Sequence, residues 1–194
     1  MNKWDKIFSN NPQFKPLNEH FLNLLLTKIK KDTNPSPQKM VDFGCGTAQT
    51  LFQFSKLGFD VTGLDFSEVA LSKVQQKIEE NKTKNIKLIK SDLSSEKINL
   101  EADIFLCSWV YTFIDNKEFF LKNVAQCLHD DSIFILITPV THQGTSYTEE
   151  DKINIAVDFE ETIKLLNNIF SNVEIYHHDY IGFREDYVTF LIKK

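Results

Sequence analysis

Two glycines and a neighbouring carboxylate in this 194-residue chain have the types and spacing of a site for a small polar ligand. Gly44 and Gly46 follow an apolar run that ends at Phe43, and Asp42 immediately precedes them. Glycine permits positive φ and close approach of a ligand to the backbone, because it has no Cβ. The next segment is expected to be a helix whose first N–H groups point back at the glycines. Together these features predict a ligand cradle.

Two further carboxylates follow the next two expected strands. Asp65 lies about 20 residues past the glycines, where a carboxylate can accept hydrogen bonds from ribose hydroxyls. Asp92 ends the strand after that, and ligands of open α/β sheets bind at such strand ends. Gln49 occupies the place of the third glycine in the dinucleotide fingerprint G-x-G-x-x-G, and the sequence has no phosphate-binding G-x-x-x-x-G-K-[ST] motif. The glycine pattern therefore argues against an NAD-type Rossmann oxidoreductase, which is kept as an alternative.

Short apolar segments alternate with amphipathic segments through the middle of the chain. This periodicity predicts a parallel sheet covered by helices on both faces. We expect strands at 39–43, 59–65, 86–90, 102–107 and 132–138, the last closed by Pro139, and helices at 47–57, 67–81 and 117–128.

The two ends of the chain differ from this middle. We expect a helix at 158–170 and then strands at 173–181 and 187–192, which are too close in sequence for a crossover helix and so form an antiparallel hairpin. The chain is expected to be one domain, in which residues 1–36 are a helical lid or cap, with an amphipathic helix over 17–31, and residues 37–194 are the cofactor-binding core.

Three segments in series resemble the motifs of class I S-adenosylmethionine-dependent methyltransferases. They are Val-Asp-Phe-Gly-Cys-Gly-Thr-Ala, Val-Thr-Gly-Leu-Asp-Phe-Ser and Lys-Ser-Asp-Leu, and the resemblance runs from Met40 to Pro139. Ala48 replaces a third glycine that many members carry. The resemblance implies a doubly wound, mostly parallel seven-stranded sheet, with helices on both faces and a closing hairpin that adds one antiparallel strand beside the fifth.

The resemblance also implies the cofactor, S-adenosyl-L-methionine, and the residues that bind it. Asp42 and the glycines would line the methionine end, Asp65 would bind the ribose hydroxyls, and Asp92 would accept from the adenine amino group. The full set of implied cofactor-binding residues is Asp42, Gly44, Cys45, Gly46, Asp65, Phe66, Asp92, Leu93 and Cys107.

The sequence carries a weaker signal for the methyl acceptor than for the cofactor. In-line transfer from a sulfonium depends mainly on placement in a dry pocket, so the cofactor motifs identify no catalytic residue. Aromatic residues and a histidine outside these motifs are the candidates for the acceptor pocket. For Tyr111 and His142 we expect a role in packing or exposure to solvent, and a general base is the alternative role. The pocket candidates are Trp4, Trp109, Tyr111 and His142.

Composition and net charge exclude some classes of binding partner. The net charge of −5 argues against a general nucleic-acid surface, and no apolar run is long enough to span a membrane. The three cysteines lack C-x-x-C pairing, and the histidines suggest no metal site. We therefore expect a cytoplasmic methyltransferase with a small-molecule acceptor. A protein or tRNA acceptor is the alternative, and a non-catalytic relative of the fold is a weaker one.

Overall fold

The computed structural model describes residues 2–10, 17, 22–23, 26–27, 38–142, 156–178 and 186–194. The chain divides into two compact units, residues 1–92 and residues 93–194. Most of the helix expected at 17–31, the end of the strand expected at 173–181 and the hairpin turn at 182–186 lie outside the described residues.

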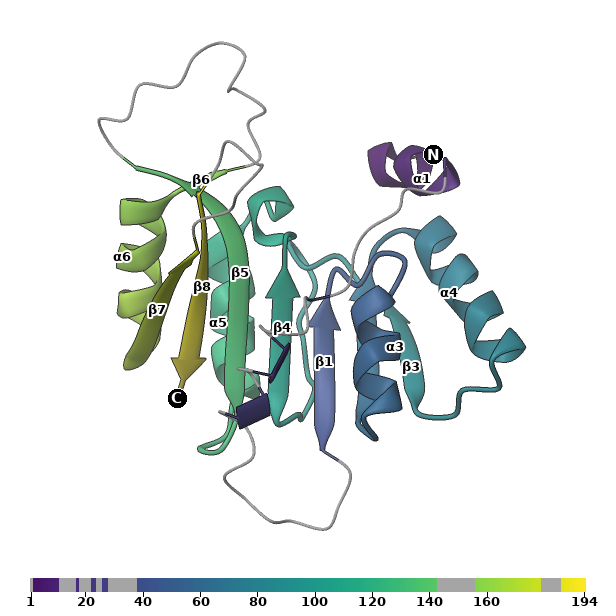
Figure 1. Ribbon diagram of the computed structural model, residues 1–194. Coiled ribbons are helices and arrows are strands. Elements are labelled where there is room, and N and C mark those ends of the chain that lie inside the picture. The colour runs from purple at the N-terminus through teal and green to yellow at the C-terminus, as the bar shows by residue number, and fades with distance from the viewer. Residues whose placement is uncertain are drawn as a thin grey trace. The chain divides into compact units, whose positions relative to one another are not determined.

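The first unit contains three parallel strands in the order β3-β2-β1. Every expected strand and helix in residues 38–92 is confirmed, with shifts of one or two residues at some ends, and a short helix precedes them (Figure 1). The elements are α1 (Lys3–Ser9), β1 (Lys39–Phe43), α3 (Gln49–Lys56), β2 (Asp60–Asp65), α4 (Glu68–Glu80) and β3 (Ile86–Lys90).

Local sequence explains where the elements of this unit begin. Helix α3 starts at Gln49 rather than at Thr47 because Ala48 has the left-handed φ of 62°. Helix α4 starts after Ser67, whose hydroxyl accepts the N–H of Ala70 at 3.2 Å and so caps the helix. Both helices therefore begin directly after the two turns that leave β1 and β2.

The second unit contains strands in the order β4-β5-β8-β7, with β6 beside β5. Strand β8 pairs antiparallel with both β5 and β7, so the closing hairpin and its antiparallel strand beside the fifth are confirmed (Figure 1). The elements are β4 (Ile104–Ser108), η1 (Tyr111–Phe113), α5 (Lys117–Cys127), β5 (Ile133–Thr141), β6 (Val157–Asp158), α6 (Phe159–Ile169), β7 (Asn172–His178) and β8 (Asp186–Lys193).

The α/β class, with mostly parallel strands, a closing antiparallel hairpin and surrounding helices, is confirmed, and two details differ from expectation. Strand β5 continues past Pro139 to Thr141, because a proline removes a single N–H donor while its neighbours still pair with β8. The short strand β6 is an eighth strand that pairs in parallel with Val140 and Thr141. Two residues are too few to give a period-2 pattern in sequence.

Gly63 lies in β2 where helix α3 and the glycine turn pack closely against the strand. A Cβ added at this glycine would lie 2.5 Å from Cδ1 of Leu51 and 2.8 Å from Sγ of Cys45. We predict that Gly63→Ala lowers the free energy of unfolding by about 1–3 kcal/mol, because both side chains must move to admit the methyl group. Urea denaturation measures the change, with Thr62→Ala as the control for the strand, and an unchanged stability for Gly63→Ala would contradict this packing.

Candidate functional site

The turn between β1 and α3 is held in an unusual backbone conformation. Gly44, Gly46 and Ala48 all have positive φ, at 72°, 51° and 62°. The N–H groups of Gly44 and Cys45 both donate to the carbonyl oxygen of Leu64, at 2.7 and 2.9 Å. These bonds fix the turn against the end of β2, so its geometry is set before any ligand binds.

Asp65 joins this turn to the turn that follows β2. Its Oδ2 accepts the N–H of Gly46 at 2.9 Å, and its Oδ1 accepts the N–H of Ser67 at 2.9 Å. Each oxygen of an ionised carboxylate has two lone pairs, so each retains the capacity to accept another hydrogen bond. The side chain can therefore position both loops and still receive two hydroxyl groups of a ligand.

Two buried carboxyl groups and a thiol lie together under the glycine turn. Asp42 is 5% exposed, and burial together with the charge of Asp65 raises its pKa to about 8. Burial also raises the pKa of Asp65, although the N–H groups of Ser67 and Gly46 oppose the shift. The pKa of the Cys45 thiol is raised by burial and by both carboxylates, so the thiol remains protonated at neutral pH. Such a site favours a ligand that carries positive charge, because a nearby cation lowers the cost of ionising a buried carboxyl.

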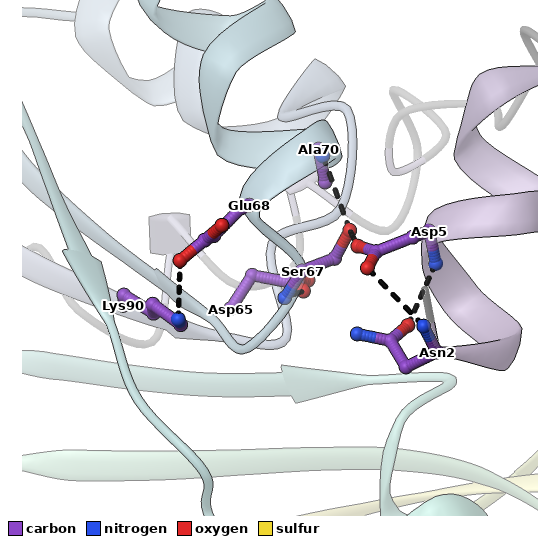
Figure 2. A network of polar contacts seen from close by, with 7 residues as sticks. All are labelled: Asn2, Asp5, Asp65, Ser67, Glu68, Ala70 and Lys90. Carbon is purple, nitrogen blue, oxygen red and sulfur yellow. Dashed lines mark hydrogen bonds and ion pairs between the residues drawn. The ribbon is translucent and has the colours of Figure 1, made fainter.

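Helix α1 packs on this turn and on the start of α4. The ring of Phe8 lies against Gly46, where a Cβ would come within 3.3 Å of its Cε1 and Cζ atoms. Ser67 donates its hydroxyl to Oδ1 of Asp5 at 2.6 Å (Figure 2), and Lys73 donates to the carbonyl oxygen of Phe8 at 2.6 Å. Trp4, a pocket candidate from the sequence, contacts Phe8 with ring centroids 5.9 Å apart. Helix α1 therefore covers one side of the glycine turn.

The other cofactor candidates lie in different environments. Phe66 follows Asp65 and is 39% exposed, as expected of a side chain available to a flat ligand ring. Asp92 is exposed and follows β3 by two residues, whereas Leu93 and Cys107 belong to the second unit and are buried there. Within the first unit, the structure brings together Asp42, the glycine turn and Asp65.

Trp109, which is exposed, and Tyr187, which is half-buried, form an aromatic pair in the second unit. Trp109 follows β4 and is 41% exposed, and its ring centroid lies 5.6 Å from that of Tyr187 in β8. The backbone of Trp109 has a φ of 60°, which is costly for a bulky residue, and its N–H donates to the carbonyl oxygen of Ile137 at 2.9 Å. Strained backbone of this kind concentrates at functional sites.

Tyr111 differs from its neighbour Trp109 because its side chain is fully buried. Its hydroxyl makes no hydrogen bond with any residue that the structure describes. Burial and the neighbouring Cys107 raise the pKa of Tyr111, so the phenol stays protonated at neutral pH. In this position it can donate a hydrogen bond but is unsuited to accept a proton as a general base.

His142 lies in a cluster of its own after β5. Its ring centroid is 4.9 Å from that of Phe159 and 6.4 Å from that of His177, and its Nδ1 lies 3.5 Å from Oε1 of Glu160. These contacts place it beside α6 and β7, whereas Trp109 contacts β8. Among the described residues, no group of three or more His, Cys, Asp or Glu side chains could hold a metal ion.

Three residues that sequence reasoning did not assign to a site contribute to these clusters. Asp5 carries only a local signal, a capping box with Asn2 at the start of α1. Ser67 is recognisable as the cap of α4, but its bond to Asp5 depends on tertiary structure. Tyr187 is paired with Trp109 only because β8 lies beside β5.

Comparison with known proteins places this geometry in a family. The family model described as a methyltransferase domain matches residues 35–179. An aligned region of 118 residues is 25% identical to the ubiquinone biosynthesis O-methyltransferase of Rickettsia bellii, and covers 60% of this chain and 49% of that protein. Over 162 residues the chain is 24% identical to human EEF1A lysine methyltransferase 2, with 78% of this chain and 64% of that protein covered. The chain thus spans about half to two thirds of these relatives.

Solved structures share the fold. Phosphoethanolamine N-methyltransferase 2 of Haemonchus contortus, in complex with phosphomonomethylethanolamine and S-adenosylhomocysteine, matches with a TM-score of 0.77 at 12% identity. The match covers 95% of this chain and 54% of that chain. None of the described helices is both long enough and apolar enough to cross a membrane.

The buried carboxyl of Asp42 makes stability depend on pH. Its folded pKa of about 8 is above the ordinary value of 3.8, so between these values the folded state holds a proton that the unfolded state releases. We predict that the free energy of unfolding falls as pH rises from 5 to 8, by up to about 1.4 kcal/mol per pH unit from this group. Asp42→Asn removes that contribution, so urea denaturation should give the variant a flatter pH profile and higher relative stability at pH 8. Parallel profiles for the two proteins would contradict a raised pKa.

Proposed function

Because the chain belongs to the methyltransferase domain family, whose class I members use S-adenosylmethionine, we propose that it transfers a methyl group from S-adenosylmethionine to a small-molecule acceptor. The observation that carries this proposal is the hydrogen bonding of Asp65, which joins the glycine turn to the α4 turn and leaves acceptor capacity on both carboxylate oxygens.

The residues of the first unit suit the parts of this cofactor. We assign the ribose hydroxyls to Asp65, and the adenine ring to Phe66 and Asp92, which are both exposed. We assign the methionine end to the glycine turn and to Asp42, whose buried carboxyl is stabilised in its charged form by a cation. In the second unit, Leu93 and Cys107 are the proposed cofactor contacts.

The chain's contribution to the reaction is placement and exclusion of water. When bound, S-adenosylmethionine supplies a methyl group activated by a positive sulfur. Buried residues around the glycine turn provide a low-dielectric environment, in which the interactions of Asp42 and Asp65 with a cation are stronger than in water. Tyr111 remains protonated, so a role in acceptor binding is as a hydrogen-bond donor. No general base is assigned.

The acceptor site is proposed at the aromatic pair of Trp109 and Tyr187. An exposed tryptophan in a strained conformation, beside a second aromatic ring, offers a flat apolar surface of small-molecule size. The names of the relatives differ in the process or target that they give, ubiquinone biosynthesis for one and a lysine of EEF1A for the other. Methylation of a protein or tRNA instead of a small molecule is an outcome that an acceptor panel would reveal.

We propose that both units belong to one methyltransferase domain. The family model, which spans residues 35–179, covers parts of both units. Residues 1–36 are the proposed helical cap, and the packing of Phe8 on Gly46 supports this assignment for α1. A cytoplasmic location is proposed on the cysteines, since all three are described and none forms a disulfide.

Cofactor binding tests the central assignment. We predict that the wild-type protein binds S-adenosylmethionine and S-adenosylhomocysteine, and that Asp65→Ala weakens both by at least about tenfold, since it removes a charge-assisted hydrogen-bonding group. Isothermal titration calorimetry measures the affinities, and a thermal-shift assay with NAD tests the oxidoreductase alternative.

Two further variants separate binding from folding in that experiment. Asp60→Ala, at the opposite end of β2, should bind both ligands as the wild type does. Asp92→Ala should weaken binding and lower the unfolding temperature less than Asp65→Ala does, because the side chain of Asp92 is exposed and that of Asp65 is buried. Absence of binding by the wild-type protein at millimolar cofactor would refute the proposed function.

The proposed role of Trp109 and Tyr187 in the acceptor site is tested by measuring the KM for the acceptor. We predict that Trp109→Ala raises the KM for a methylated acceptor by about tenfold or more, through loss of apolar contact area, and leaves the Kd for S-adenosylmethionine within twofold. The measurement is formation of S-adenosylhomocysteine across a panel of small molecules, proteins and tRNA. Trp109→Phe is the matched control, because it keeps an aromatic face. Equal loss of cofactor and acceptor binding would remove the pair from the acceptor site.

A further inference from the structure

Asp5 is a carboxylate from the N-terminal helix that reaches the proposed ribose-binding loop. Its Oδ1 accepts the hydroxyl of Ser67 at 2.6 Å, and the N–H of the same serine donates to Asp65 (Figure 2). One residue therefore separates the two acids in the hydrogen-bond network. The bond from Ser67 also lowers the pKa of Asp5, so this carboxylate is ionised at neutral pH.

Two lysines lie near this network. Nζ of Lys90 lies 2.5 Å from Oε1 of Glu68, so this pair adds no net charge (Figure 2). Lys73 donates to the carbonyl oxygen of Phe8, one turn of α1 beyond Asp5, and keeps its positive charge because that acceptor is neutral. Burial is the main cause that raises the pKa of Asp65, and the charge of Asp5 adds to it. Asp5 and Asp65 thus place two carboxyl groups on either side of Ser67.

The packing of α1 gives this charge a fixed position. Phe8 is buried against Gly46, three residues after Asp5 on the same helix, so the helix is held at two points. Asp5 also accepts the N–H of Asn2 at 3.4 Å, which closes the capping box. A side chain held at both of its oxygens presents its charge in one orientation and loses little entropy on ligand binding.

We propose that Asp5 is a positioning residue of the cofactor site that favours the positively charged methyl donor over its uncharged product. This inference rests on the proposed function, because it takes the cradle to be the S-adenosylmethionine site. The donor carries a sulfonium and the product carries a neutral thioether in its place, and the two molecules otherwise present the same groups. A fixed negative charge that does not touch the reacting sulfur therefore attracts the donor more strongly and lowers product inhibition.

Asp5→Asn removes the negative charge and keeps an oxygen that can accept the Ser67 hydroxyl. Its amide nitrogen replaces the oxygen that accepts the N–H of Asn2, so the long capping bond at the exposed end of α1 is lost as well. We expect the Kd for S-adenosylmethionine to rise about two- to fivefold, the range for a single partly exposed charge pair, and the Kd for S-adenosylhomocysteine to change less than that. The difference should shrink in 0.5 M salt, because exposed charges are screened. Calorimetric titration of the apoprotein at pH 7 gives both constants without reference to turnover.

Two controls make the outcome decisive. Asp60→Asn removes one negative charge from the far end of β2 and should leave the ratio of the two constants unchanged. Asp5→Ala removes the charge and the bond to Ser67, so it should weaken both ligands in addition to lowering the ratio. Equal effects of Asp5→Asn on donor and product, or no effect on either, would overturn the inference. A wild-type protein that binds neither ligand would instead overturn the proposed function.

Discussion

The hydrogen bonding of Asp65 is the constraint on which the rest of the first unit depends. Its two oxygens each accept a backbone N–H, from the turn after β1 and from the turn after β2. Backbone bonds from Gly44 and Cys45 to Leu64 fix the first of these turns against the end of β2, and Asp65 adds the bond that joins it to the second turn. Both helices that leave these turns are consequently oriented by one carboxylate. A substitution there affects the ligand and the fold together, which is why an exposed acid such as Asp92 reports on binding more cleanly.

The cost of this arrangement is a concentration of acid in the interior. Asp42 lies under the same turn, and at neutral pH it holds a proton because water cannot stabilise its charge. A cationic ligand reverses that balance, since it supplies the counter-charge that the protein lacks at this point. The unliganded protein is thus less stable than its packing alone would allow, and ligand binding restores the difference. The buried carboxyl of Asp42 therefore lowers the stability of the unliganded protein and favours the binding of a cationic ligand.

The sequence predicts the strands better than the site, for a physical reason. Strand β1 matches its expected bounds because four consecutive buried residues carry a local signal. The end of β5 beyond Pro139 could not be foreseen, since its pairing partners lie far along the chain. Asp5 shows the same limit at the site, because its capping box is visible in sequence whereas its bond to Ser67 is tertiary. Local sequence patterns therefore predict helices and strands. The contacts that complete a site join residues that are far apart in the sequence, so these patterns do not predict them.

The aromatic pair proposed as the acceptor site depends on the topology of the second unit. Trp109 leaves β4 with a left-handed backbone, and its N–H bond to Ile137 holds that conformation. Its ring then meets Tyr187, which β8 supplies because it lies antiparallel beside β5. Neither residue is within the three sequence segments that resemble the cofactor motifs, so each can change without altering the glycine turn or Asp65. If the proposed acceptor site is correct, acceptor choice can vary at the hairpin and after β4 without a change in the glycine turn or Asp65.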